Sequence, residues 1–271
     1  MSVPLKFFPL GTSRLHWAIS YISRHNGADV TFPNFGCFQS AGQIRTVLEI
    51  LSGATEIPDI CHYIFRKDAF PGNPFNERAL TNDHDFWLQK RTQFATADVL
   101  LIELSSPVEF ILGNLHVQGN PNYRQEVPFT EVWKTGYYKI YEPDIDVERR
   151  AFTQAELAKT MEDCGKLTGG RPVVVQSHIY QAGQDHGRAT FATQVAAQSK
   201  ALGWSFVDAA ALCETHGYRI LQSGQTDIHH LSWPGTRTNA VRILEAGLSA
   251  VGNSLSPAMR EAILEDQSEP I

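Results

Sequence analysis

Residues 98–104 read Asp-Val-Leu-Leu-Ile-Glu-Leu, and this stretch decides the fold. Its almost unbroken apolar character is typical of a parallel strand that is buried on both faces. Similar short apolar runs occur at Leu5–Leu10 and at Pro172–Gln176, and we expect each to form a strand. Asp29–Phe32 and Trp204–Val207 are predicted as further strands of the same sheet.

Segments with apolar residues at helical spacing alternate with these strands. The expected helices cover Leu15–Ile22, Gln39–Leu51, Thr153–Leu167, Ala189–Leu202 and Ser232–Val251. This alternation predicts an α/β fold, a three-layer sandwich with a mostly parallel, flavodoxin-like central sheet and helices on both faces. We expect a single domain over residues 1–251, with an irregular insertion at about 105–150. A polar C-terminal tail, residues 252–271, is expected to hang on the outside.

The composition is that of an ordinary globular protein. The 271 residues are 42% hydrophobic and carry a net charge of −6, which gives no general attraction to nucleic acid or to an acidic membrane. No run of about 18 apolar residues occurs, so we expect no membrane-spanning helix. Met1–Phe8 has no pattern of a secretory signal. The cysteines have no CxxC spacing, so we expect reduced, mostly buried thiols in a cytoplasmic protein and no zinc site; they are Cys37, Cys61, Cys164 and Cys213.

The carboxyl end of the first strand carries a serine. In a sheet of this kind, ligands bind where the carboxyl ends of the strands open into a crevice. Ser13 follows Gly11 and Thr12 where a buried strand gives way to a helix, whose unpaired N–H groups suit an oxyanion. Serine is also a common N-cap at this position, and Gly11-Thr12-Ser13 alone favours capping.

A second polar segment, Asp227-Ile228-His229-His230, precedes the last expected helix. An Asp and a His three positions apart, on a loop entering a helix, can fold so that the carboxylate accepts the imidazole Nδ1–H and leaves Nε2 free for a serine proton. A turn Asp with two surface histidines would explain the pair, but not its position opposite a strand-end serine. The spacing from Asp227 favours His230 over His229 as the base. We therefore predict Ser13, Asp227 and His230 as the catalytic residues.

The order of these segments resembles the SGNH/GDSL family of hydrolases. In that family a Gly-x-Ser block follows the first strand and an Asp-x-x-His block precedes the last helix, as in Gly11–Ser13 and Asp227–His230. Leu231–Gly235 resembles the usual continuation into the last helix, and Gly203–Asp208 resembles the strand ending in Asp that comes before it. The resemblance implies ester chemistry through an acyl-enzyme.

The resemblance also implies an oxyanion hole, which the middle of the chain matches only in part. The family expects a glycine after the second strand and an asparagine after the third. Gly36 fits the first place, whereas the third strand is followed by Ser105 and Ser106 with no Gly-x-Asn. We predict Ser13, Gly36 and Ser105 as the donors, with the Ser106 hydroxyl or Asn114 of the insertion as alternatives for the last. Loss of one such donor can cost roughly 10²–10³ in rate.

Arg14, His178 and Asn114 are the predicted substrate-binding residues. Arg14 could bind an anionic group, although a surface position on the first helical turn is the first expectation. His178, at the end of the fourth strand, lines the crevice or is a satisfied structural histidine. Five aromatic residues of the insertion stack on a sugar or form the small core of a lid; they are Phe129, Trp133, Tyr137, Tyr138 and Tyr141.

The sequence therefore predicts a serine esterase for a small-molecule or carbohydrate ester, without cofactor or metal and without nucleic acid or membrane as a partner. The alternatives are an acyltransferase with the same triad and a non-catalytic binding protein with this fold. A nucleotide-binding domain fits poorly, because the first turn lacks GxGxxG and the chain lacks GxxxxGK[ST]. The substrate, the acyl acceptor and the oligomeric state stay open.

Overall fold

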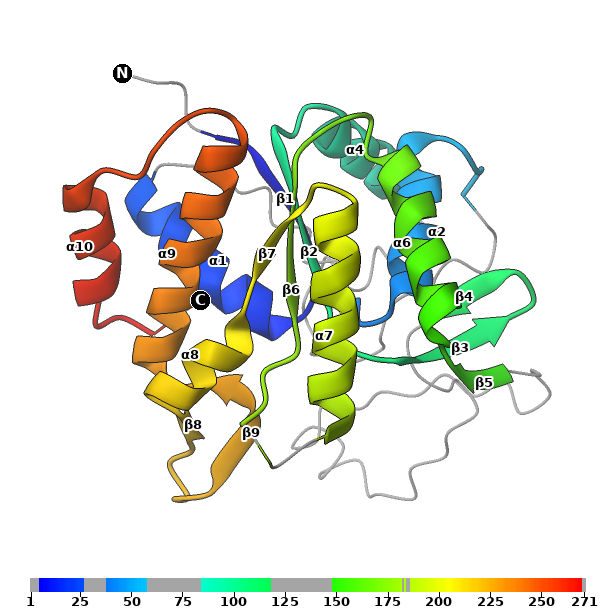
Figure 1. The fold of residues 1–271 in the computed structure, drawn as a ribbon. Coiled ribbons are helices and arrows are strands. Elements are labelled where there is room, and N and C mark those ends of the chain that lie inside the picture. The colour runs from blue at the N-terminus through cyan, green and yellow to red at the C-terminus, as the bar shows by residue number, and fades with distance from the viewer. Residues whose placement is uncertain are drawn as a thin grey trace.

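The computed structural model describes residues 5–26, 38–57, 84–117, 148–181, 183 and 186–269. A parallel sheet forms the middle layer (Figure 1), and its strands in spatial order are β1 (Phe7–Leu10), β2 (Val99–Leu104), β6 (Val173–Ser177) and β7 (Ser205–Val207). The pairing aligns Leu10 with Ile102 and Leu104 with Ser177, so the strands end at one edge of the sheet. The strand expected at 29–32 lies outside the described residues.

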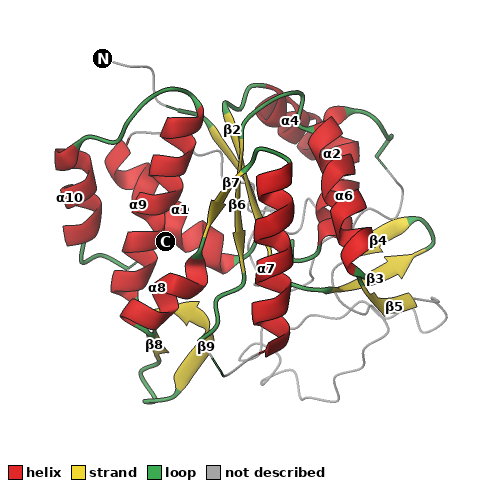
Figure 2. Ribbon diagram, in the orientation of Figure 1, coloured by secondary structure: helices red, strands yellow, loops and turns green. Residues whose placement is uncertain are grey.

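Alternate residues of the central strand β2 point into two different helical layers. Leu100, Ile102 and Leu104 join the larger core, and Val99 and Leu101 join the smaller one. The larger core is covered by α2 (Ala41–Ser52), α4 (His84–Ala95), α6 (Gln154–Leu167) and α7 (His186–Ala201). The smaller core is covered by α1 (Ser13–Asn26) and α9 (Trp233–Ala250). Helices thus lie on both faces of the sheet (Figure 2), and the predicted three-layer α/β sandwich is confirmed.

Local capping explains where two of the predicted helices begin. Thr153 and Glu156 form a capping box at the start of α6, and Ser232 caps α9, with Pro234 in its first turn. The sequence did not reveal α4 or α8 (Ala209–His216). Asp208 caps α8, so the residue that ends the expected strand also begins a helix.

The described part of the expected insertion contains regular strands, contrary to the expectation for those residues. β3 (Val108–Leu112), β4 (Leu115–Val117) and β5 (Glu148–Ala151) form a small antiparallel sheet in the order β4-β3-β5. Charged residues within these short strands hide the alternation that would have revealed them. The five aromatic residues singled out from the sequence, Phe129 to Tyr141, lie outside the described residues.

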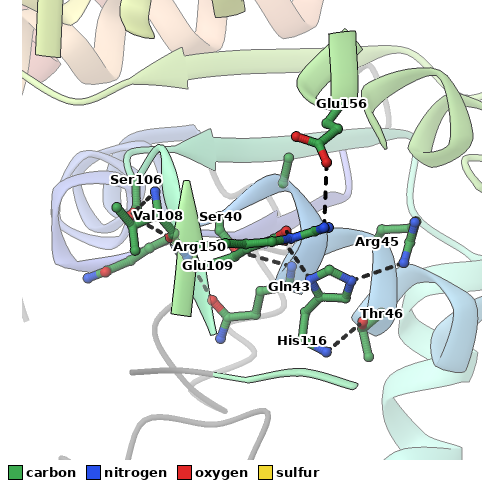
Figure 3. Close-up of polar contacts among 12 residues, drawn as sticks. Ser40, Gln43, Arg45, Thr46, Ser106, Val108, Glu109, His116, Arg150 and Glu156 are labelled. Atoms are coloured by element: carbon green, nitrogen blue, oxygen red, sulfur yellow. Dashed lines mark hydrogen bonds and ion pairs between the residues drawn. The ribbon is translucent and has the colours of Figure 1, made fainter. Parts of the chain in front are cut away.

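A buried ion-pair cluster joins this small sheet to α2 (Figure 3). The fully buried Glu109 accepts a hydrogen bond from Arg150 Nε at 2.7 Å, and its other carboxylate oxygen lies 2.6 Å from His116 Nδ1. Arg45 of α2 donates to His116 Nε2 at 3.0 Å, which connects the helix to the small sheet. A Cβ at Gly42 would lie 2.1 Å from His116 Nδ1, and this close approach of α2 explains the glycine.

The tail does not hang outside the fold, contrary to expectation. Its residues form α10 (Pro257–Glu265), which packs against α1 and α9. Leu255, Met259 and the fully buried Ile263 recur every four residues and join the smaller core. Asp266 then contacts Arg24 Nε at 3.3 Å, which ties the end of α10 to α1.

Two of the four cysteines can be described, and both are buried free thiols, as predicted. Burial raises the pKa of Cys164 to about 12, and it also raises the pKa of Cys213. Cys37 and Cys61 lie outside the described residues. None of the described helices has the length and the apolar character needed to cross a membrane.

Candidate active site

The first turn of α1 presents the Ser13 hydroxyl to a histidine. The carbonyl oxygen of Thr12 accepts hydrogen bonds from the N–H groups of Leu15 and His16, so Thr12 holds the N-cap position. Ser13 Oγ instead lies 2.7 Å from Nε2 of His230. The capping interpretation of Ser13 therefore does not hold.

His230 and Asp227 lie on β9 (Thr226–Leu231), which pairs with β8 (Tyr218–Ile220), and not on a loop as expected. The register jumps from the pair Arg219–Asp227 to the pair Tyr218–Leu231, so residues 228–230 bulge out of the hairpin. The bulge brings His230 Nδ1 to 2.7 Å from Asp227 Oδ2, although residues three positions apart on a regular strand face opposite sides. The three predicted catalytic residues are thus brought together in one hydrogen-bonded chain.

The two carboxylate oxygens of Asp227 distinguish the two neighbouring histidines. Oδ2 contacts the ring of His230, whereas Oδ1 accepts the backbone N–H of His229 at 3.1 Å. The ring of His229 faces that of His178 edge-on, at a centroid distance of 6.0 Å. His230 is therefore the histidine in contact with Ser13, as its spacing predicted.

The surroundings of His230 favour its neutral form. Burial is the largest influence and lowers its pKa below the usual value, although Asp227 acts in the opposite direction. With Nδ1–H donated to Asp227, Nε2 carries the lone pair and can accept the Ser13 proton. The arrangement has the geometry and protonation that serine nucleophilic catalysis needs.

An aromatic stack supports His230 from α1. Trp17 lies against the imidazole with ring centroids 4.1 Å apart and planes at 29°, and it contacts Trp233 at 5.1 Å. The Arg219 guanidinium lies 5.1 Å from the Trp17 ring and 4.4 Å from the Trp233 ring. Sequence analysis missed Trp17, although its position four residues after Ser13 on a helix puts both on one face.

The serines after β2 differ in what their hydroxyls contact. Both donate their N–H groups to the carbonyl oxygen of Gln39 at 2.9 Å. Ser106 Oγ is engaged with the carbonyl oxygen of Val108 at 2.8 Å. Ser105 Oγ is buried and has no hydrogen-bond partner within the described part of the chain, which favours it over Ser106 as a donor. The other predicted donor, Gly36, lies outside the described residues.

The predicted substrate-binding residues have three different surroundings. Arg14 is not on the surface, as was first expected; its side chain is 9% exposed and its Nε donates to Glu103. His178 is buried near His229, and its Nδ1 contacts the carbonyl oxygen of Ile179 at 2.6 Å. Asn114 lies in the exposed turn between β3 and β4, across the fold from the β8–β9 hairpin (Figure 1), so its predicted role at the site is wrong.

No protein-family model matches the chain, and a search of curated proteins gives no match. Within the described ranges, no group of three or more His, Cys, Asp or Glu side chains could hold a metal ion.

Proposed function

We propose that this protein is a serine hydrolase of the SGNH/GDSL type, which cleaves an ester through an acyl-enzyme. The observation that carries the proposal is the chain Ser13–His230–Asp227, with two contacts of 2.7 Å. Ser13 and His230 are 217 positions apart, and their elements meet at the carboxyl edge of the sheet, where ligands of such folds bind.

In the proposed reaction, Ser13 Oγ attacks the ester carbonyl carbon and its proton passes to His230 Nε2. Asp227 stabilises the imidazolium that forms. The tetrahedral intermediate then expels the alcohol, which takes the proton from Nε2, and the acyl group stays on Ser13. Water repeats the sequence: it gives a proton to Nε2, attacks the acyl carbon and releases the acid while Ser13 recovers its proton.

Three donors are proposed for the oxyanion: the backbone N–H groups of Ser13 and Gly36, and the Ser105 hydroxyl. The register aligns Leu10 with Ile102, so Ser105 follows β2 at the same edge at which Ser13 follows β1. Its buried, unpartnered hydroxyl is the described group that best fits the place of the family's asparagine.

His178 supports a hydroxyl-bearing substrate such as a sugar ester. Burial is the largest influence and lowers its pKa to about 2, so the imidazole stays neutral. Because Nδ1–H is donated to the carbonyl oxygen of Ile179, Nε2 can only accept a hydrogen bond. A neutral acceptor suits a substrate O–H group, and it also favours a second candidate function, acyl transfer from Ser13 to a sugar hydroxyl.

Hydrolysis of 4-nitrophenyl acetate tests the proposal. Ser13→Ala and His230→Ala should each abolish most turnover, because groups that act as a unit fail together. Ser52→Ala, which removes an exposed hydroxyl from the end of α2, is the matched control and should keep full activity. Near-full activity in Ser13→Ala would overturn the proposal. Adding candidate sugars then separates the two functions, since a transferase forms sugar esters in place of free acetate.

A further inference from the structure

A fully buried carboxylate, Glu103 near the end of β2, contacts the residues on both sides of Ser13. Oε2 accepts hydrogen bonds from the backbone N–H and from the hydroxyl of Thr12, both at 2.7 Å. Oε1 accepts the Nε–H of Arg14. One side chain thus holds positions 12 and 14 and leaves the hydroxyl between them free for His230.

The backbone of this segment lies directly on Glu103. A Cβ placed on Gly11 would come within 2.8 Å of the Glu103 Cβ, so a larger residue at position 11 would push the segment off the strand. Gly11 is therefore required for this contact.

Arg14 extends the contact to the strand that carries the base. Its Nη1 lies 3.5 Å from the carbonyl oxygen of His229, the residue before His230. Because the Arg14 side chain is 9% exposed and Glu103 is not exposed at all, each charge depends on the other for compensation. The pair connects β2, the start of α1 and β9.

We propose that Glu103 and Arg14 form a positioning pair, which holds the Ser13 segment against β9 and balances the charge beside His230. The effect on rate rests on the proposed acyl transfer. The effect on the charge beside His230 does not depend on that reaction, because the folded protein has this charge arrangement even without substrate.

The charged groups that face His230 come from separate elements. Asp227 lies on its own strand, Glu103 comes from β2 and Arg14 from α1, while Arg219 of β8 lies 5.1 Å from the Trp17 ring. Glu103 raises the pKa of His230 and Arg14 lowers it, so the two partly cancel. Removing the charge of only one of these two residues should shift the pKa of His230, and the direction of the shift identifies which charge was removed.

The test measures the titration of His230 by NMR and the pH profile of kcat/KM for 4-nitrophenyl acetate. Glu103→Gln should move the His230 midpoint and the acid limb to lower pH, because the Arg14 charge is left uncompensated. Arg14→Met should move both to higher pH, and the double variant should return toward the wild type. Misplacement of Ser13 in Glu103→Gln should lower kcat by about 10- to 100-fold with a smaller effect on KM, and Glu103→Asp should recover part of this loss.

Glu109→Gln is the matched control, because Glu109 is also a fully buried carboxylate bonded to an arginine, in the small sheet. It should lower stability without moving the His230 midpoint. Equal midpoints in Glu103→Gln, Arg14→Met and wild type would overturn the proposal and leave the pair a purely structural role. If Glu103→Gln does not fold, Arg14→Met decides the question from the other charge. If the wild type hydrolyses no ester, the proposed function fails, but the NMR midpoints still decide whether the pair balances the charge at His230.

Discussion

Replacing Trp17 by alanine removes the aromatic surface that covers His230, the proposed general base. The ring lies 4.1 Å from the His230 ring at 29°, a stacked contact of a kind that contributes about 0.5–1.5 kcal/mol. If this contact is fully formed in the transition state, kcat/KM should fall by about 2- to 12-fold on the high-pH plateau. Trp17→Phe, which keeps a stacked ring, should lose less.

The pH dependence gives Trp17→Ala a second signature. Burial is the main cause of the lowered pKa of His230, so admitting water should raise that pKa. More of the base is then protonated at a given acidic pH, and the deficit in kcat/KM should widen as the pH falls. The assay is the kcat/KM profile of 4-nitrophenyl acetate hydrolysis between about pH 4 and 8, the range around the reference histidine value.

A second tryptophan provides the control. Trp204, just before β7, packs against the larger core on the other face of the sheet. Trp204→Ala should lower the free energy of unfolding, whereas the acid limb of its kcat/KM profile should coincide with that of the wild type. If the acid limb of the Trp17→Ala kcat/KM profile is unmoved, or displaced to lower pH, the argument that the indole excludes water from His230 is refuted.

The remaining predictions concern stability and accessibility. Gly42→Ala should lower the free energy of unfolding by about 1–3 kcal/mol in urea titrations, because the new methyl group overlaps the buried pair of Glu109 and His116; an unchanged midpoint would contradict that packing. Although burial raises the pKa of Asp266, hydrogen bonds from His25 and Ser268 outweigh it and lower the pKa to about 2. The stability lost in Asp266→Asn should therefore be greatest above about pH 4 and shrink between pH 4 and 2, whereas a pH-independent difference would refute the linkage. Cys164 should stay unmodified by a thiol reagent in native protein at pH 8 and react once urea unfolds the chain, since burial raises its pKa to about 12.

The central sheet could be predicted from the sequence because buried parallel strands carry a local signal. Residues 99–104 are apolar almost throughout, and no neighbouring segment is needed to recognise them. Glu103 is the exception within this strand, and the structure explains it by contacts with Thr12 and Arg14, two residues about ninety positions away. Pairing over such a distance leaves no periodic pattern, so the role of Glu103 could not be anticipated.

The contacts among Ser13, His230 and Asp227 could be predicted from the sequence, but the way the chain presents these residues could not. The spacing of Asp227 and His230 suggested a loop, whereas the structure achieves their contact through a bulge in a short hairpin. Strand β8 is three residues long and half exposed, so its alternation is too short to recognise. The strands of the small sheet around Glu109 are also short, so their alternation is equally hard to recognise from the sequence. This is why that segment was expected to be irregular.

The central claim is that Ser13 is a nucleophile activated by His230, and labelling by a fluorophosphonate probe tests it most directly. Mass mapping of the labelled protein should find the phosphonyl group on the peptide that contains Ser13. The wild-type protein should be labelled rapidly, and His230→Ala should react far more slowly. A folded wild-type protein that takes up no label, or that carries the label on another serine, would contradict the claim.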